Sequence, residues 1–550
     1  MRKNILFVVL PTLPMSDLIP DKDKVFVTKI KPDIPLGVLS LATYMEKYNN
    51  VKVHILDLNL RFSELIANNK FDEKHTPEKY IFQYMEEYRE KEIDFCGISA
   101  LFCPAYGYLE IVSRASKVIF GKKTIVAAGG GVPSNLMAEV FADAPCIDII
   151  SYGEGEIALS GFIGADREKE YLEKSKSLLT REKVKNGFKY EFEFIENLDE
   201  IPTLNVSLID FEKYNNYVHK QDRKKVVAMP LMFSRGCPFN CCFCASHSVH
   251  GKKVRYNSIN RIKADIDFYV KEYNVNTIII WDDNFFADRK QGLALLEYFS
   301  SRNLTIEFVN GLPVYCIDDE IAYSLKMAGV DYVTLAIESG NAKVLKDIIH
   351  KPLTLEMVPK AIQCLEKNNI YSKGLFVIGF PSETKEDIEV TMNFINQSRL
   401  RWASIFIASP LPGSELYDIC VREKLLKSNN LEAASYLKGN IKTAEFTPEE
   451  LEDIQVYNTI KKDFVNNLDM QERCWESALI NFEFTINAKH ENPFAYYYAS
   501  IAAMKLGIKE KQEEYFEKYA VIRKNNQNWE NLFQRFISEG INFELCSDKY

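Results

Sequence analysis

The sequence contains no long apolar run and no excess of basic residues among its 550 positions. The apolar stretch at 4–11 is much shorter than the roughly 20 residues of a membrane-spanning helix, and no small-residue cleavage site follows it. The formal net charge of −9 gives no support for a nucleic-acid partner, which usually needs a basic face. We therefore expect no membrane span, no export signal and no nucleic-acid partner.

Cysteines paired in the manner of a disulfide framework are also lacking. Isolated thiols usually act as small buried hydrophobic side chains. With no export signal, they indicate a reducing compartment, the cytoplasm. Eight of the twelve cysteines are scattered singly in this way: Cys96, Cys103, Cys146, Cys316, Cys364, Cys420, Cys474 and Cys546.

The other four cysteines lie together in SRGCPFNCCFCASH at 234–247. Cys237, Cys241 and Cys244 form a C-x3-C-x2-C pattern, whereas Cys242 would point away from them in a compact loop. Three thiolates on one loop can hold three irons of a 4Fe–4S cluster and leave the fourth iron open for a small molecule. We predict that these three cysteines are the metal ligands and the catalytic centre.

Zinc is the alternative metal for the same loop. Structural zinc sites usually pair two C-x2-C units or combine cysteine with histidine. No second cysteine pair lies within 50 residues on either side, but His247 and His250 can supply a fourth ligand. By ligand count alone, a binding protein with a structural zinc loop stays open.

The sequence around the loop favours the cluster. Residues 226–236 have the pattern of a strand that ends in Gly236, and 258–273 have helical periodicity with Ser258 as a cap. This arrangement resembles the radical S-adenosylmethionine (SAM) superfamily. The resemblance implies that the open iron binds the amino and carboxylate groups of SAM. An electron from the cluster then releases a 5′-deoxyadenosyl radical.

Strand and helix patterns alternate through the rest of 226–440. Further strands are expected at 276–284, 304–310, 331–341, 371–384 and 402–416. About six βα units imply parallel strands with right-handed crossovers, fewer than the eight of a closed barrel. The superfamily resemblance implies an open, partial (β/α)6 TIM-like barrel.

Polar side chains and glycines lie at the carboxyl ends of these strands. Enzymes with such folds have their active sites at this edge. The resemblance implies that Phe243 lies against the adenine and that Glu338 binds the ribose or the amino group. It also places Asp282 and Asp283 near the methionyl amino group, and Gly379 beside the adenine. Strand-end solvation or helix capping is the alternative for the two aspartates, and a plain turn with a helix cap is the alternative for GFPSET (379–384).

Strand and helix patterns also alternate in residues 1–165. This alternation predicts a doubly wound, Rossmann-like α/β domain. Ser99 and Leu101 form an S-x-L pattern, and Gly129 and Gly130 follow at a spacing that resembles cobalamin-binding domains. GEGE at 153–156 is also common in these radical enzymes.

One part of the sequence pattern of cobalamin-binding domains is not matched in this sequence. Asn59 stands where the cobalt-ligating histidine would be, and an amide is a poor cobalt ligand. We therefore expect cobalamin without a protein histidine on its lower face; a domain that has lost cobalamin is the alternative. Lys252, Lys253 and Arg255 are interpreted as a solvated face, with contact to a phosphate or a carboxylate as the alternative.

Two further segments complete the expected organisation. We expect a linker at 166–225 and an α-helical region at 441–550. Residues 492–526 in that region have the pattern of two helices with a turn at Gly507, which resembles a tetratricopeptide repeat. A packing lid for the barrel is a more economical interpretation than a partner site.

These observations predict a radical SAM enzyme that methylates an unactivated carbon, or phosphorus, with the help of cobalamin. The expected cofactors are a 4Fe–4S cluster, SAM and cobalamin. The cofactors supply the chemistry, and the protein binds and orients them. The expected partners are a small-molecule or peptide substrate and an electron donor such as flavodoxin or ferredoxin. A radical cyclase or rearrangement enzyme without methyl transfer is the alternative.

Overall fold

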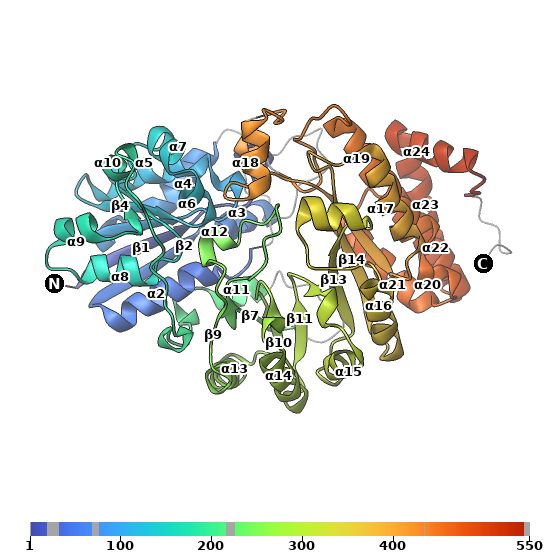
Figure 1. Cartoon of the computed structure of the whole chain (residues 1–550), viewed down its shortest axis with the longest axis horizontal. Coiled ribbons are helices and arrows are strands. Elements are labelled where there is room, and N and C mark those ends of the chain that lie inside the picture. The colour runs from blue at the N-terminus through green and yellow to red at the C-terminus, as the bar shows by residue number, and fades with distance from the viewer. Residues whose placement is uncertain are drawn as a thin grey trace.

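The computed structural model describes residues 2–18, 32–68, 76–215, 226–428, 430–433 and 435–543. The N-terminal sheet lies at one end, a second group of strands in the middle and a set of helices at the other end (Figure 1). The last part of the expected linker, 216–225, and Cys546 lie outside the described residues. No helix of the described part is long and apolar enough to cross a membrane.

The N-terminal sheet has six strands in the order β2-β1-β3-β4-β5-β6. Strands β1 to β5 are parallel, and β6 is antiparallel to β5. The strand order reverses direction between β1 and β3, where doubly wound sheets bind ligands. The strands are β1 (Lys3–Val9), β2 (Val51–Asp57), β3 (Phe95–Ser99), β4 (Ile125–Gly129), β5 (Ile149–Ser151) and β6 (Leu178–Leu179).

Helices cover both faces of this sheet, which confirms the predicted doubly wound fold. Ile5 and Phe7 of β1 belong to the hydrophobic core on one face, and Leu6 and Val8 belong to the core on the other. This alternation follows from the two-residue period of a strand. The helices that supply these cores include α2 (Leu36–Tyr48), α8 (Glu156–Gly164), α4 (Pro77–Glu86) and α5 (Tyr108–Phe120).

The stretch that we expected to be a linker contributes to this first unit. Strand β6 lies at 178–179 and pairs with β5. Residues 166–215 also hold α9 (Glu168–Lys174), α10 (Arg181–Lys185) and α11 (Phe211–Asn215). A two-residue antiparallel strand is too short to leave a clear pattern in the sequence.

The middle of the chain forms two parallel sheets in the orders β11-β10-β7 and β12-β13-β14-β15. All six expected strands are present, with β12 as a short addition. Among the described residues the two sheets are not hydrogen-bonded to each other, so a continuous barrel is not confirmed. The strands are β7 (Ala228–Leu231), β10 (Thr277–Ile280), β11 (Thr305–Phe308), β12 (Leu312–Pro313), β13 (Tyr332–Glu338), β14 (Tyr371–Ile378) and β15 (Trp402–Ile407).

Amphipathic helices alternate with these strands, and one hydrophobic core extends beneath both sheets. Ser258 caps the start of α13, since its side chain accepts a hydrogen bond from the Arg261 backbone N–H, as predicted. The helices are α13 (Ile259–Tyr273), α14 (Arg289–Arg302), α15 (Asp319–Met327), α16 (Met357–Lys367) and α17 (Lys385–Gln397).

The C-terminal helices pack on the edge strand β15. The Asp463 carboxylate accepts a hydrogen bond from the Ala403 backbone N–H at 2.8 Å. Gly507, at φ +73°, makes the predicted turn between α22 and α23. This packing supports the interpretation as a lid. The helices are α19 (Pro448–Ile460), α20 (Leu468–Gln471), α21 (Trp475–Ala488), α22 (Pro493–Lys505), α23 (Lys509–Asn525) and α24 (Gln527–Ser538).

The seven single cysteines among the described residues are free thiols, and most are at least partly buried. Cys96, Cys103, Cys316 and Cys420 are buried, as expected. The expectation is wrong for Cys474, which is exposed just before α21.

Candidate active site

A cavity of about 380 Å³ lies at the carboxyl ends of the N-terminal strands. The strand register places Val9, Ser99, Gly129 and Ser151 in one row across β1, β3, β4 and β5, and all four line the cavity. Gly129 leaves a gap between two serines, because a Cβ there would meet nothing closer than Ser151 Cβ at 3.7 Å.

All four residues predicted for cobalamin line this cavity: Ser99, Leu101, Gly129 and Gly130. Gly130 has φ +102°, and a Cβ on it would lie 2.7 Å from the Ala100 carbonyl oxygen. Only glycine fits this close approach of two backbones. Leu101 is 54% exposed at the cavity wall, although leucine is usually buried.

Ser151 is a cavity residue that the sequence analysis missed. Its hydroxyl is buried and has no hydrogen-bond partner among the described residues. Buried hydroxyls are rarely left unpaired in native proteins, so this one suits a polar group of a ligand. No sequence pattern marked it; only its register beside Gly129 does.

The side chain of Asn59, which stands where the cobalt-ligating histidine would be, is hydrogen-bonded to other residues of the chain. Its Oδ1 accepts a hydrogen bond from the Thr12 backbone N–H at 2.8 Å, and its Nδ2 donates to the Leu10 carbonyl at 3.1 Å. The side chain therefore fastens the loop after β1.

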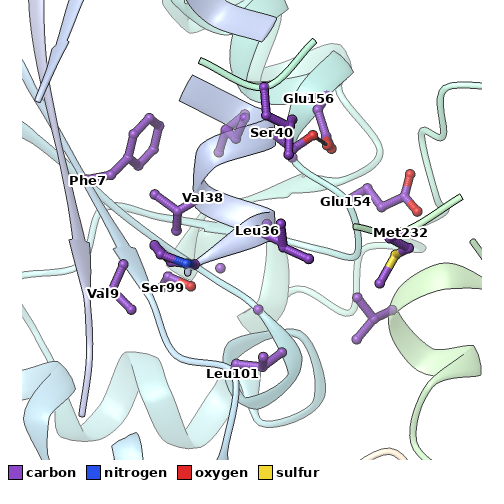
Figure 2. A pocket seen from close by; sticks show the side chains of 18 of the residues that line it. Phe7, Val9, Leu36, Val38, Ser40, Ser99, Leu101, Glu154, Glu156 and Met232 are labelled. Atoms are coloured by element: carbon purple, nitrogen blue, oxygen red, sulfur yellow. Dashed lines mark hydrogen bonds between the residues drawn. The ribbon is translucent and has the colours of Figure 1, made fainter. Parts of the chain in front are cut away.

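The opposite wall of the cavity comes from the middle of the chain. Met232, Phe233, Arg235 and Trp281 follow β7 and β10 and line the same space. Figure 2 shows Val38 and Leu36 on one side and Met232 across from them. The cavity thus lies between the N-terminal sheet and the strand that leads into the cysteine loop.

Cys237, Cys241 and Cys244 are free and partly buried in that loop. Burial, together with the nearby Asp283, Cys241 and Cys237, raises the pKa of the Cys244 thiol to about 11. Among the described residues no three His, Cys, Asp or Glu side chains converge on a point that could hold one metal ion. Thiolates that bind three different irons of a cluster need no such convergence, and these three cysteines as its ligands stay a prediction.

Cys242 differs from its neighbours, as predicted. It is buried in the hydrophobic core, and burial raises its pKa to about 12. Its backbone N–H donates to Ile349 at 3.0 Å, and its carbonyl accepts from Leu416 at 2.8 Å. Cys242 therefore anchors the loop.

The two aspartates after β10 bind the segment of the cysteine loop. Asp282 is buried and accepts hydrogen bonds from the Phe233 backbone N–H at 2.8 Å and from Ser234 Oγ. Burial raises its pKa to about 7. Asp283 accepts from Ser246 Oγ at 2.6 Å. These bonds give both residues a structural role, and their contact with SAM stays a prediction.

Glu338 ends β13 in the left-handed region, at φ +71°. It is buried and pairs with Lys351, whose Nζ lies 2.8 Å from Oε1. Burial alone would lower the pKa of Lys351, but Glu338 and the thiols of Cys241 and Cys237 raise it. A positive charge beside the cysteine loop was not foreseen, since Lys351 follows a helix and lies in no predicted motif.

The turn after β14 lies beside the aromatic of the loop. The ring of Phe243 is 6.2 Å from that of Phe380, next to Gly379, so the structure brings the predicted pair together. Gly379 has φ +89°, and Glu383 accepts hydrogen bonds from the backbone N–H groups of Gly379 at 2.7 Å and Phe380 at 3.1 Å. Thr384 forms a capping box at the start of α17, as the turn-and-cap alternative predicted.

A buried ion network joins the two walls of the cavity. Arg255 contacts Glu154 through both terminal nitrogens at 2.9 and 2.6 Å, and Arg235 reaches it at 3.2 Å. Arg235 also contacts Glu156 at 2.9 Å. The interpretation of Arg255 as part of a solvated face is wrong: its guanidinium is buried against the carboxylate of Glu154, which lies 101 residues earlier in the sequence.

The radical SAM superfamily model matches residues 231–395, from the end of β7 to α17. The middle of the chain is a radical SAM domain. The protein is therefore a radical SAM enzyme, as the sequence predicted. This match favours a cluster over zinc for the cysteine loop.

The similarity to other proteins extends beyond the radical SAM domain. An uncharacterised methyltransferase of Pyrococcus horikoshii is 27% identical over 76% of this chain and 85% of its own. The cytidylyl-2-hydroxyethylphosphonate methyltransferase of Streptomyces wedmorensis is 26% identical over 74% and 82%. An anaerobic magnesium-protoporphyrin IX monomethyl ester cyclase of Rubrivivax gelatinosus is 28% identical over 61% and 60%.

A solved structure has the same fold over almost the whole chain. It is that of the cobalamin-dependent SAM radical enzyme OxsB with aqua-cobalamin and SAM bound. The TM-score is 0.63 over 98% of this chain and 81% of that one, at 14% identity. The likeness shows that the N-terminal sheet and the radical SAM domain occur together in one known architecture.

Proposed function

We propose that this radical SAM enzyme is a cobalamin-dependent methyltransferase. The observation that carries the proposal is the cavity that both parts of the chain line. Ser99, Leu101 and Gly129 line one side, and Arg235, two residues before Cys237, lines the other. A cofactor in this cavity would lie next to the segment that holds the cluster.

The bound groups would supply reductive cleavage of SAM to a 5′-deoxyadenosyl radical and a carrier for a methyl group. The residues of the chain bind and orient these groups. Cys237, Cys241 and Cys244 would hold the cluster, Glu338 and Phe243 would hold SAM, and the gap at Gly129 would admit part of the cobalamin. The apolar residues of the cavity would exclude water.

Methylation of an unactivated carbon or phosphorus fits the relatives named as methyltransferases, one of which acts on a phosphonate. Radical cyclisation without methyl transfer is the second candidate, since a relative is named as a cyclase. A small-molecule or peptide substrate, an electron donor such as flavodoxin or ferredoxin, and a reducing cytoplasm belong to the same proposal.

Anaerobic reconstitution tests the proposal. The protein should hold about four irons per chain and bind added hydroxocobalamin. The electron paramagnetic resonance spectrum of the cob(II)alamin form should show no nitrogen splitting from a lower ligand, because Asn59 is bonded to its own loop. Failure to bind cobalamin would favour the cyclase candidate.

A further inference from the structure

His250 lies on the cavity wall, and no assigned role explains it. It ends the short helix α12 (His247–His250) after the cysteine loop, and its side chain is 23% exposed. Its Nδ1 lies 2.9 Å from Glu154 Oε1, across the boundary between the two parts of the chain. No hydrogen bond involves its other ring nitrogen, Nε2, among the described residues.

The contact with Glu154 decides which nitrogen carries the proton. Burial alone would raise the pKa of Glu154. Arg235, Arg255 and His250 nevertheless hold this pKa far below its usual range. An ionised carboxylate only accepts hydrogen bonds. Nδ1 must therefore donate, so in the uncharged ring the lone pair is on Nε2.

The network also fixes the direction of the ring. Glu154 is buried and held by Arg255 through both oxygens. Arg255 in turn donates to the carbonyls of Ile195 at 2.9 Å and His250 at 3.2 Å, and stacks on Phe194 at 4.2 Å. Neither Glu154 nor Arg255 can turn away without losing several charged contacts.

Several other polar groups of the cavity are already used within the chain, whereas among the described residues the Ser151 hydroxyl is not. Ser40 donates to Glu156 at 2.7 Å, Asn59 is bonded to the loop after β1, and Arg261 is paired with Asp265 at 2.9 Å. His250 therefore offers an acceptor on a wall with many apolar side chains, including Leu36, Val38, Leu101 and Met232 (Figure 2).

We propose that His250 is a binding residue of the cavity, whose Nε2 accepts a hydrogen bond from a primary amide of cobalamin. This inference rests on the proposed function, because the corrin ring carries primary amide side chains at its edge. Glu154 is the positioning residue: it sets the tautomer and the direction of the ring.

Titration of the reconstituted protein with hydroxocobalamin, followed by absorbance, tests the proposal. His250→Phe keeps a ring but removes the acceptor, so it should weaken binding roughly 2- to 12-fold, the scale of one hydrogen bond. His250→Gln places an acceptor oxygen near the position of Nε2 and should restore part of the loss. His247→Phe, on the same short helix but outside the cavity lining, should bind as the wild type does.

Iron content and thermal unfolding show whether each variant is folded. Equal affinity of folded His250→Phe and wild type would overturn the inference while leaving the proposed function intact. Nitrogen splitting of cob(II)alamin that is present in the wild type and absent from His250→Phe would also overturn it, because Nε2 would then ligate cobalt. A wild type that binds no cobalamin would refute the proposed function and the inference together.

Discussion

Each cysteine of the loop has a distinct environment, and this difference can be measured. Cys241→Ala should abolish iron binding after anaerobic reconstitution, because two thiolates cannot hold the cluster that three would. Cys242→Ala should keep about four irons, since its thiol is buried in the hydrophobic core. Iron and sulfide analysis of both variants checks this. A cluster that survives in Cys241→Ala would refute the ligand assignment.

Glu338 raises a different question at the scale of the residue, since its carboxylate already binds Lys351. If Glu338 also contacts SAM, Glu338→Gln should weaken SAM binding by about 1.5–3 kcal/mol, the scale of a hydrogen bond to a charged group. Equilibrium binding of SAM to the reconstituted protein measures this.

The double variant Glu338→Gln with Lys351→Met separates binding from stability. Glu338→Gln alone leaves the partly buried ammonium group of Lys351 without its opposite charge, which is destabilising. The double variant should recover thermal stability and still bind SAM weakly. Recovery of both properties would mean that Glu338 acts only through the ion pair.

Motif residues could be predicted individually, whereas partners distant in sequence could not. Cys237, Cys241 and Cys244 are predicted from their spacing, and Ser99 and Gly129 from a sequence pattern. The partner of Arg255 is Glu154, in another part of the chain, and a pattern of lysines and arginines gives no sign of it. Ser151 and Lys351 were missed for the same reason: only strand register and helix packing bring them to the site.

At the scale of the element, the turn after β14 depends on one buried carboxyl. Burial raises the pKa of Glu383 to about 7, and its two backbone hydrogen bonds only partly oppose this. Because folding raises this pKa, the protonated group stabilises the fold fully below about pH 4.5, and the contribution is lost as pH rises through about 7. The loss of the Glu383 contribution lowers the free energy of unfolding by up to about 3 kcal/mol.

Glu383→Gln removes the titrating proton and keeps an acceptor for Gly379 and Phe380. The difference in apparent melting temperature between pH 5 and pH 8 should therefore be smaller in this variant than in the wild type. Glu386→Gln, an exposed change in the first turn of α17, is the matched control and should keep the wild-type difference. An unchanged difference in Glu383→Gln would show that this carboxyl does not titrate between those values.

Long elements were predicted well and short ones were not. The strands of the radical SAM domain and the helix after the cysteine loop appear where the sequence patterns placed them. Strands β6, β8 (Ser234–Arg235), β9 (Arg255–Tyr256) and β12 have two residues each and too few positions to show a period. The antiparallel pair β8 and β9 matters most, since it carries both arginines that contact Glu154.

At the scale of the whole molecule, the central feature is that one cavity belongs to both parts of the chain. The sequence predicted a cofactor domain and a cluster domain separately. Their shared wall, built by Glu154, Arg235 and Met232 among others, depends on how the two parts dock. The ion network fixes this docking through buried pairs, which are costly to separate because an unpaired buried charge is strongly destabilising.

The division of labour between the two parts gives the most direct test of this account. Reconstituted protein with cobalamin, SAM and a strong chemical reductant should form both 5′-deoxyadenosine and cobalamin-dependent S-adenosylhomocysteine, quantified by chromatography. Gly129→Leu fills the gap between Ser99 and Ser151 and should reduce S-adenosylhomocysteine most, whereas Glu338→Gln should reduce 5′-deoxyadenosine most. Equal loss of both products in both variants, or 5′-deoxyadenosine from the wild type without cobalamin-dependent S-adenosylhomocysteine, would contradict it.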